Sequence, residues 1–161
     1  MVRRMPRFLL ALAAAAAAML AAAPAANALV QIDRGIAGAR LGNTQAQVRA
    51  ALGKPRRVTR GTNDFGRFVV FRYAGGIQVT FQGATRVSGV STSGLGDRTA
   101  RGVGVGSTEA QVAAKVPGVR CEVVAGDRLC HTGSFQAGKA MTLFLMDAGK
   151  VRRVDVAILF D

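Results

Sequence analysis

The sequence predicts an α+β fold of two tandem repeats, each a short helical segment packed on an antiparallel sheet of about four strands. Three observations lead to this prediction: a self-match at an offset of 64 positions, a helix-start signature in each copy, and alternating apolar residues after each signature. Residues 33–92 align with 97–156 without a gap, so that Asp33-Arg34 falls on Asp97-Arg98. An ungapped match that holds at both ends indicates two copies of one structural unit.

Residues 1–28 have the pattern of a cleaved signal peptide. Three arginines before position 8 form a basic start, an apolar stretch follows over 8–22, and Ala26-Asn27-Ala28 matches a small-x-small cleavage site. We therefore expect an exported mature chain that begins at Leu29. An N-terminal membrane anchor is the alternative, although the apolar run is short for a span of about 20 residues. The mature chain then divides into repeat 1 (29–92), a linker (93–96) and repeat 2 (97–161).

A capping box marks the start of one helix in each repeat. A hydroxyl and an amide three residues apart can satisfy the free N–H groups of a first helical turn. These boxes are Thr44 with Gln47 and Thr108 with Gln111. Apolar residues four positions apart follow each box, and proline and glycine then end each helix. The residues before the boxes, 35–41 and 99–105, are expected to form either a turn or a short first helix.

After each helix the apolar pattern changes to strict alternation. Over 77–82, apolar residues alternate with Gln78, Thr80 and Gln82, which predicts a strand with one apolar and one polar face. Turns that contain glycine separate the expected strands. These strands are 57–60, 67–73, 77–82 and 86–91 in repeat 1, and 120–124, 128–132, 141–146 and 151–160 in repeat 2.

The chain is strongly basic. Its formal net charge is +13, and loss of the three leader arginines leaves +10 on the mature chain. The charge is dispersed, which favours a solvated basic surface; attraction to anionic polymers such as cell-wall or nucleic-acid phosphates is the alternative. With no tryptophan and one tyrosine, the chain has few platforms on which bases could stack, so no specific nucleic-acid binding is expected.

Cys121 and Cys130 are the only cysteines. In an exported chain they are expected to form a disulfide across the first hairpin of repeat 2. A redox-active pair is the alternative, but it lacks the close C-x-x-C spacing. His131 has neither a nucleophile motif nor clustered carboxylates to accompany it, so no catalytic residue, metal ligand or cofactor is expected. The glycine-rich run 102–106 lacks the lysine of a phosphate loop and is expected to turn the chain into the second helix cap.

The helix signature and the cysteines after it resemble the β-lactamase inhibitor protein family of secreted bacterial proteins. That family repeats a helix-turn-helix plus four-stranded sheet module, each with a G-M-T-x-x-x-V signature and a disulfide just beyond it. Gly106 to Val112, followed by Cys121 and Cys130, is similar in order and spacing, and Gly42 to Val48 matches in the first copy. A weaker similarity links the signature to the small lipoproteins of the outer-membrane barrel-assembly machinery, which are scaffolding components.

The sequence departs from the inhibitor pattern in three respects. Repeat 1 has no disulfide, and Asn43 and Ser107 stand where the signature has methionine. The sheet would present arginine, glutamine and threonine where the inhibitors use aromatic and acidic contacts. No inhibitor contact residue can be placed on this sequence, so inhibition of a β-lactamase is not expected.

Together these patterns predict a non-enzymatic protein that is secreted, or periplasmic if the host has two membranes. No acid–base pair or nucleophile–base spacing stands out. We expect it to bind an unidentified protein partner through its sheet face, as an interaction or inhibitor-like module does. The alternative is binding of anionic cell-envelope polymers by the dispersed basic surface. Candidate contact residues are Arg72, Tyr73, Gln78, Thr80, Arg152 and Arg153.

Overall fold

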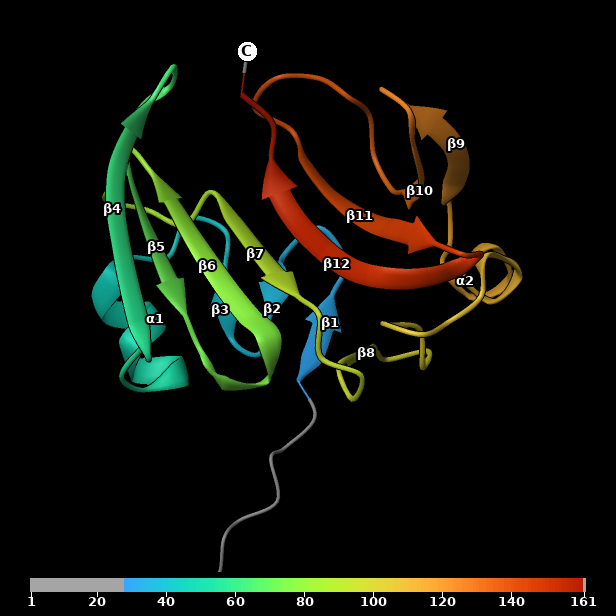
Figure 1. The fold of residues 1–161 in the computed structure, drawn as a ribbon, viewed down its shortest axis with the longest axis horizontal. Helices are drawn as coiled ribbons and strands as arrows, with labels where there is room; N and C mark the ends of the chain where they lie inside the picture. Colours follow the sequence, from blue (N-terminus) through green and yellow to red (C-terminus); the bar gives the residue numbers. More distant parts are fainter. Residues whose placement is uncertain (1–27, 161) are drawn as a thin grey trace, which may run out of the picture.

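The computed structural model describes residues 28–160, so nearly all of the predicted signal peptide lies outside the described residues. Two sheets and two short helices form the fold (Figure 1). The large sheet is antiparallel throughout, in the order β4 (Arg57–Asn63), β5 (Gly66–Arg72), β6 (Ile77–Gln82), β7 (Gly89–Thr92), β12 (Lys150–Ile158), β11 (Ala140–Asp147), β10 (Asp127–His131) and β9 (Arg120–Val124). The small sheet has the order β3 (Ala39–Arg40), β2 (Gly35–Ile36), β1 (Leu29–Gln31) and β8 (Arg98–Thr99). The helices are α1 (Gln45–Leu52) and α2 (Glu109–Lys115), with a short 3-10 turn, η1 (Ala74–Gly76).

The predicted α+β fold of two helix-plus-sheet repeats is wrong. The structure is mostly β, and the strands expected for the two repeats form a single sheet of eight rather than two sheets of four, beside a small four-stranded sheet that was not expected. The junction is the antiparallel pair β7–β12, where Val90 lies opposite Val156. This pairing satisfies backbone groups that two separate sheets would each expose at an edge.

The second difference lies before each helix. Residues 35–41 and 99–105, expected as turns or helix, contribute β2, β3 and part of β8 to the small sheet. These strands have only two residues each, so they are too short to show an alternating pattern in the sequence. The helices, of eight and seven residues, cover only part of the large sheet.

The local signals agree with the structure. Thr44 Oγ1 accepts from the Gln47 amide at 3.3 Å, and Gln47 Oε1 accepts from the Thr44 amide at 2.8 Å. Thr108 and Gln111 repeat this capping box at 3.2 and 2.9 Å. The eight strands of the large sheet begin and end within three residues of the predicted positions. Capping and alternation therefore located the two helices and the strands of the large sheet, although neither the small sheet nor the arrangement of the strands.

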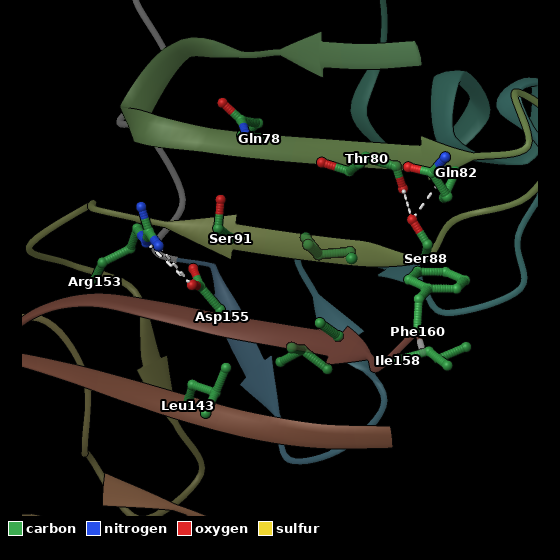
Figure 2. Close-up of a pocket in the computed structure, with 14 residues that line it drawn as sticks. Gln78, Thr80, Gln82, Ser88, Ser91, Leu143, Arg153, Asp155, Ile158 and Phe160 are labelled. Atoms are coloured by element: carbon green, nitrogen blue, oxygen red, sulfur yellow. Dashed lines mark hydrogen bonds and ion pairs between the residues drawn. The ribbon is translucent and has the colours of Figure 1, made fainter. Parts of the chain in front are cut away.

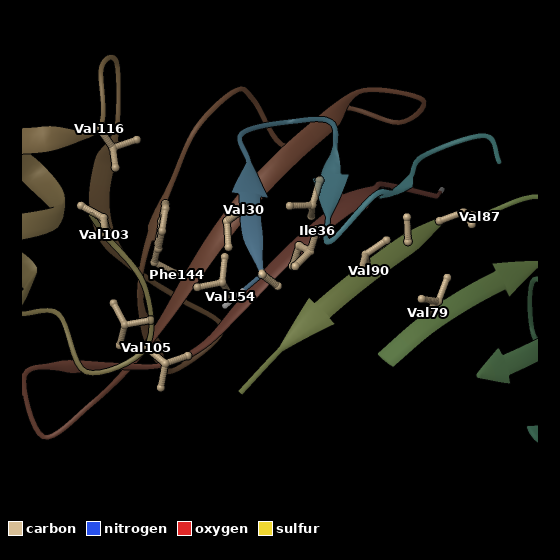
Figure 3. Close-up of a cluster of buried hydrophobic side chains, with 14 of the residues drawn as sticks. Val30, Ile36, Val79, Val87, Val90, Val103, Val105, Val116, Phe144 and Val154 are labelled. Atoms are coloured by element: carbon tan, nitrogen blue, oxygen red, sulfur yellow. The ribbon is translucent and has the colours of Figure 1, made fainter. Parts of the chain in front are cut away.

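The core lies between one face of the large sheet and a layer made of α1, the small sheet and α2 (Figure 3). The sheet contributes fully buried aromatic side chains, and the covering layer contributes mainly valine and isoleucine, each worth roughly 1.5–3 kcal/mol when buried. Core residues from the two sides are Phe71, Phe81, Phe144, Val90 and Val154, and Val30, Ile36, Val48 and Val112. The opposite face of the large sheet, called the outer face below, is not covered by any helix or strand of residues 28–160.

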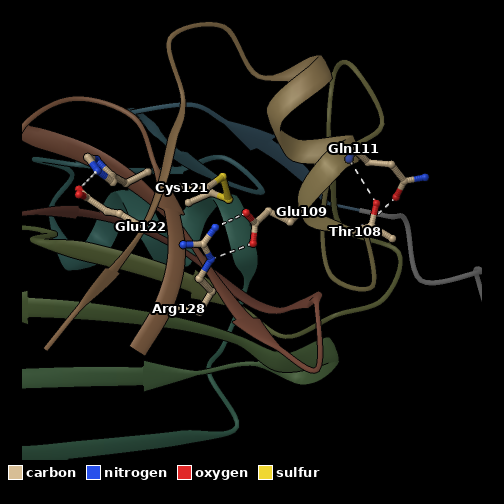
Figure 4. The surroundings of a disulfide bond; sticks show 8 residues. Thr108, Glu109, Gln111, Cys121, Glu122 and Arg128 are labelled. Carbon is tan, nitrogen blue, oxygen red and sulfur yellow. Dashed lines mark hydrogen bonds and ion pairs between the residues drawn. A yellow bond between two sulfur atoms is a disulfide. The ribbon is translucent and has the colours of Figure 1, made fainter. Parts of the chain in front are cut away.

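The predicted disulfide joins Cys121 and Cys130, which face each other across β9 and β10 (Figure 4). Beside it, Glu109 at the start of α2 forms an ion pair with Arg128 of β10, which ties the helix to the sheet. The glycine-rich run turns tightly into α2, as expected: a Cβ on Gly104 would lie 2.0 Å from the Asp97 carbonyl oxygen. Within residues 28–160, no helix has both the length and the apolar character needed to cross a membrane.

Candidate functional site

A single row of side chains crosses the outer face at the level of Ser91. In a strand pair, directly opposite residues project from the same face, so the strand register defines the row. Its members, from β4 to β9, are Arg57, Arg72, Gln78, Ser91, Asp155, Leu143, His131 and Arg120. The row is basic and polar except for one carboxylate and one leucine at its centre.

A hollow of about 320 Å³ lies on the outer face between β6 and β11 and is called the central hollow (Figure 2). It exists because the residues at its centre, Gly89, Ser91 and Ala157, are small. A Cβ added to Gly89 would meet the Ala157 Cβ at 3.6 Å, an ordinary van der Waals contact, so the space at this position is open. The volume falls in the range of small binding sites, about 300–1,000 Å³.

The exposed side chain of Phe160 lines one end of the central hollow, and Phe65 packs against Phe160 from outside the lining. Phe65, in the β4–β5 turn, and Phe160, beyond the end of β12, have ring centroids 5.9 Å apart. Two strands lie between β5 and β12 in the sheet, so this contact requires the sheet to curl over its outer face. The rings remain 52% and 48% exposed. Exposed aromatic residues beside a hollow are typical anchors of protein interfaces.

An ion pair occupies the other end of the central hollow. Arg153 donates from Nε and Nη2 to Asp155 Oδ2, at 3.1 and 2.9 Å (Figure 2). Asp155 Oδ1 is buried and has no hydrogen-bond partner among the described residues. Burial raises the pKa of the Asp155 carboxyl, and the guanidinium of Arg153 opposes this effect only in part. The site therefore holds a carboxylate that is incompletely satisfied by its own protein.

The described residues that line the central hollow include no second group for acid–base chemistry. Among residues 28–160, Arg153 is the only titratable side chain that lines it besides Asp155, and a guanidinium cannot serve as a base. His131 lies farther along the row, where it is 2% exposed. Its Nε2 contacts Glu122 at 2.8 Å, and its ring lies 4.6 Å from that of Phe135. Within residues 28–160, this histidine is therefore covered rather than presented to a substrate.

The structure brings together three of the six predicted contact residues. Gln78, Thr80 and Arg153 all line the central hollow. Arg72 projects from the same face beside Gln78 but lies outside the hollow. Arg152 is exposed at the irregularity between β11 and β12, where Leu145 pairs with Arg153 and Met146 with Val151, and Arg152 is the extra residue.

Tyr73 follows Arg72 directly in the chain, so strand alternation places their side chains on opposite faces of the sheet. It packs against the core with Phe71, at a ring-centroid distance of 6.5 Å, on the side covered by α1. Arg49 of α1 lies 4.4 Å above the Phe71 ring. Burial raises the pKa of Tyr73, with a smaller opposing effect from Arg49. Tyr73 therefore does not line the face on which the other predicted contact residues lie.

Sequence reasoning missed Asp155, Ser91 and Phe160. The alternation over 151–160 does place Arg153, Asp155 and Ala157 on one face of a strand, so Asp155 could have been named from that pattern. Its position opposite Ser91 could not, because that requires the pairing of β7 with β12.

One cluster of potential metal ligands occurs among the described residues: Glu109, Cys121 and Cys130. Both sulfur atoms are in the disulfide, and Glu109 is paired with Arg128. These side chains are thus already committed to structural bonds.

No protein-family model and no curated protein matches this chain. An extracellular protein containing a SCP domain from Bacillus anthracis str. Ames has a similar fold, with 11% identity and a TM-score of 0.50 over 73% of this chain and 44% of that one. A cysteine-rich secretory protein from Staphylococcus aureus has 13% identity and a TM-score of 0.48 over the same shares. A DUF4309 family protein from Bacillus subtilis has 19% identity and a TM-score of 0.47 over 76% of this chain and 83% of that one. This chain spans less than half the length of the first two proteins, and the similarity to the first, at 11% identity, shows the fold alone. The resemblance to β-lactamase inhibitor proteins stays a prediction.

Proposed function

We propose that this protein is an exported, non-catalytic binding module that holds a protein partner at the central hollow of its outer face. The observation that carries the proposal is the composition of that hollow. It has a buried, incompletely satisfied carboxylate and its arginine at one end, and the exposed Phe160, which packs against Phe65, at the other. A partner segment with a polar group next to an apolar side chain would match both ends.

The described residues of the central hollow include no acid–base pair, which favours binding over catalysis. Asp155 has the raised pKa expected of a functional carboxyl, which by itself would suit a general acid. Its Oδ2 is held by Arg153, and its Oδ1 is shielded from solvent. A carboxyl that is held by an arginine and shielded from solvent is better suited to a binding interface than to proton transfer, because a charged pair at an interface contributes to specificity.

Export rests on two features. The leader-like residues 1–28 match a signal peptide, and a disulfide joins Cys121 to Cys130. Disulfides persist in oxidising compartments outside the cytosol. The same oxidised form should be used in every binding measurement.

The test compares the exported, disulfide-bonded protein with two variants of the outer face. Gly89→Val places a side chain in the central hollow, where the backbone allows it. Thr59→Val is the matched control, because Thr59 lies on the same face of β4 but outside the hollow. Each protein is immobilised, and the proteins retained from the host's envelope and culture fluid are identified at low and high salt. Thermal unfolding establishes that both variants are folded.

We expect the wild type and Thr59→Val to retain one protein in near-stoichiometric amount through high salt. Gly89→Val should bind that protein at least tenfold more weakly, because the valine side chain would occupy the space that a side chain of the partner enters. Equal retention by Gly89→Val would show that the central hollow is not the binding site. If polyanions were retained instead, with log affinity falling linearly with log salt concentration, the alternative function of binding envelope polymers would be correct.

A further inference from the structure

A second hollow, of about 390 Å³, lies beside the first strand of the small sheet and is called the basic hollow. It forms where three separate segments meet: β1 and the residues after it, the end of β8, and the end of α2. It is distinct from the central hollow, since the two share no lining residue. Nothing in the proposed function uses it.

The floor of the basic hollow is apolar. Leu29, Ile32, Val116 and Pro117 line it, and the Leu29 side chain is 48% exposed. When an apolar ligand covers a half-exposed apolar side chain at a concave surface, the loss of contact with water favours binding. The floor thus favours a hydrocarbon group over a sugar or a free ion.

The rim of the basic hollow carries only positive charge. Arg34, Arg101 and Lys115 line it, and no aspartate or glutamate does. Among the ion pairs of the described residues, none involves these three side chains. Arg101 makes one long hydrogen bond, from Nη1 to the Lys115 carbonyl oxygen at 3.4 Å, which leaves its other donors for a ligand. Three unpaired cations above an apolar floor are complementary to an anionic head on an apolar tail.

We propose that the basic hollow binds a single-chain amphiphile with an anionic head, such as a long-chain carboxylate. The tail lies on Leu29, Ile32 and Pro117, and the head faces the cations of Arg34, Arg101 and Lys115. The volume is within the range of small-molecule sites, about 300–1,000 Å³.

Calorimetric titration of the exported protein with saturated carboxylates of increasing chain length tests this inference. Each added methylene should tighten binding about fourfold until the hollow is full, after which affinity should level off. The alcohol and the trimethylammonium of equal chain length should bind more weakly than the carboxylate, the ammonium most weakly of all. Amide NMR shifts should concentrate on Val30 to Ile32 and on Thr99 to Arg101, and should leave Ser91 and Asp155 unchanged.

Three variants separate the roles of head and tail. Arg101→Gln with Lys115→Gln should weaken carboxylate binding about tenfold and leave alcohol binding unchanged, since these cations contact only the head. Arg56→Gln with Arg60→Gln removes the same charge from exposed positions elsewhere and should have little effect. Leu29→Gln should weaken the carboxylate and the alcohol equally, because it changes the apolar floor.

Four outcomes of the binding measurements would overturn the proposal. They are equal affinity for carboxylate and alcohol, affinity independent of chain length, an equal loss in the Arg56 and Arg60 control, and binding only to vesicles of anionic lipid without binding of the free carboxylates. The last outcome would show that the cations attract a membrane surface rather than hold a single chain. Shifts confined to Ser91 and Asp155 would place the ligand in the central hollow and would equally refute it.

Discussion

Replacing Asp155 by Asn should stabilise the protein at neutral pH, although it removes an ion pair. Asp155 is 18% exposed, and its Oδ1 has no hydrogen-bond partner. A buried polar atom left without a partner costs about 1–3 kcal/mol. Asparagine keeps the shape of the side chain and still places a polar atom at this position, but it removes the charge, which is what makes the burial more costly. Arg153 is 47% exposed, so water can solvate its guanidinium when the partner is neutral.

The sign of the effect follows from the raised pKa of Asp155. A carboxyl whose pKa is higher in the folded than in the unfolded state weakens the fold as it ionises. The protonated Asp155 makes its full contribution to the stability of the fold below the ordinary pKa, near 3.8. That contribution is lost as pH rises through the higher pKa of the folded state. We therefore expect Asp155→Asn to gain roughly 1 kcal/mol at neutral pH, or about 3–5 °C in Tm for a domain of this size. The gain should vanish in acid.

Urea unfolding of both proteins across the acid to neutral range measures this difference. Glu109→Gln is the matched control, because the hydrogen bond from Arg128 lowers the pKa of Glu109 instead of raising it. That variant should lose stability above the ordinary pKa of glutamate, so the two substitutions should have opposite signs. If Asp155→Asn proved less stable than the wild type at neutral pH, the ion pair with Arg153 would outweigh the cost of burial and the reasoning would be wrong.

Two further predictions concern the disulfide and the N-terminal start of the chain. Replacing Cys121 and Cys130 by serine should lower the free energy of unfolding by about 2–3 kcal/mol, because the bond closes a short loop in the unfolded chain; unchanged urea midpoints would contradict this. A chain that begins at Leu29 should be about 1–3 kcal/mol less stable than one that begins at Ala26, because the amide of buried Ala28 donates to Asp97 Oδ1 at 2.8 Å. Equal unfolding curves for the two chains would show that the ammonium of Leu29 replaces this bond.

The sequence predicted the local elements far better than their assembly. Capping boxes and alternation depend on residues within one turn or one strand, and both helix starts and the strands of the large sheet were located from them. The pairing of Val90 with Val156 joins strands that are far apart in the chain. Neither β7 nor β12 has a sequence feature that distinguishes pairing with the other strand from a solvent-exposed edge. The single eight-stranded sheet could therefore not be predicted from the apolar pattern alone.

The candidate site shows the same limit. The polar face of β6 was predicted, and Gln78 and Thr80 do line the central hollow. Asp155 lines that hollow only because β12 lies next to β7. Tyr73 does not line it, because strand alternation turns its side chain to the core. Residue type identified polar candidates, whereas the strand register decided which of them share a face.

The two hollows should respond differently to the basic charge of the whole protein. A formal net charge of +13 for the full chain speeds the encounter with any anion, and added salt screens this long-range effect. Selection at short range depends instead on the groups inside each hollow. Asp155 in the central hollow repels an anionic group that the overall charge has attracted, whereas the rim of the basic hollow contains no carboxylate. Affinity at the basic hollow should therefore fall steeply with salt, while affinity at the central hollow should change little.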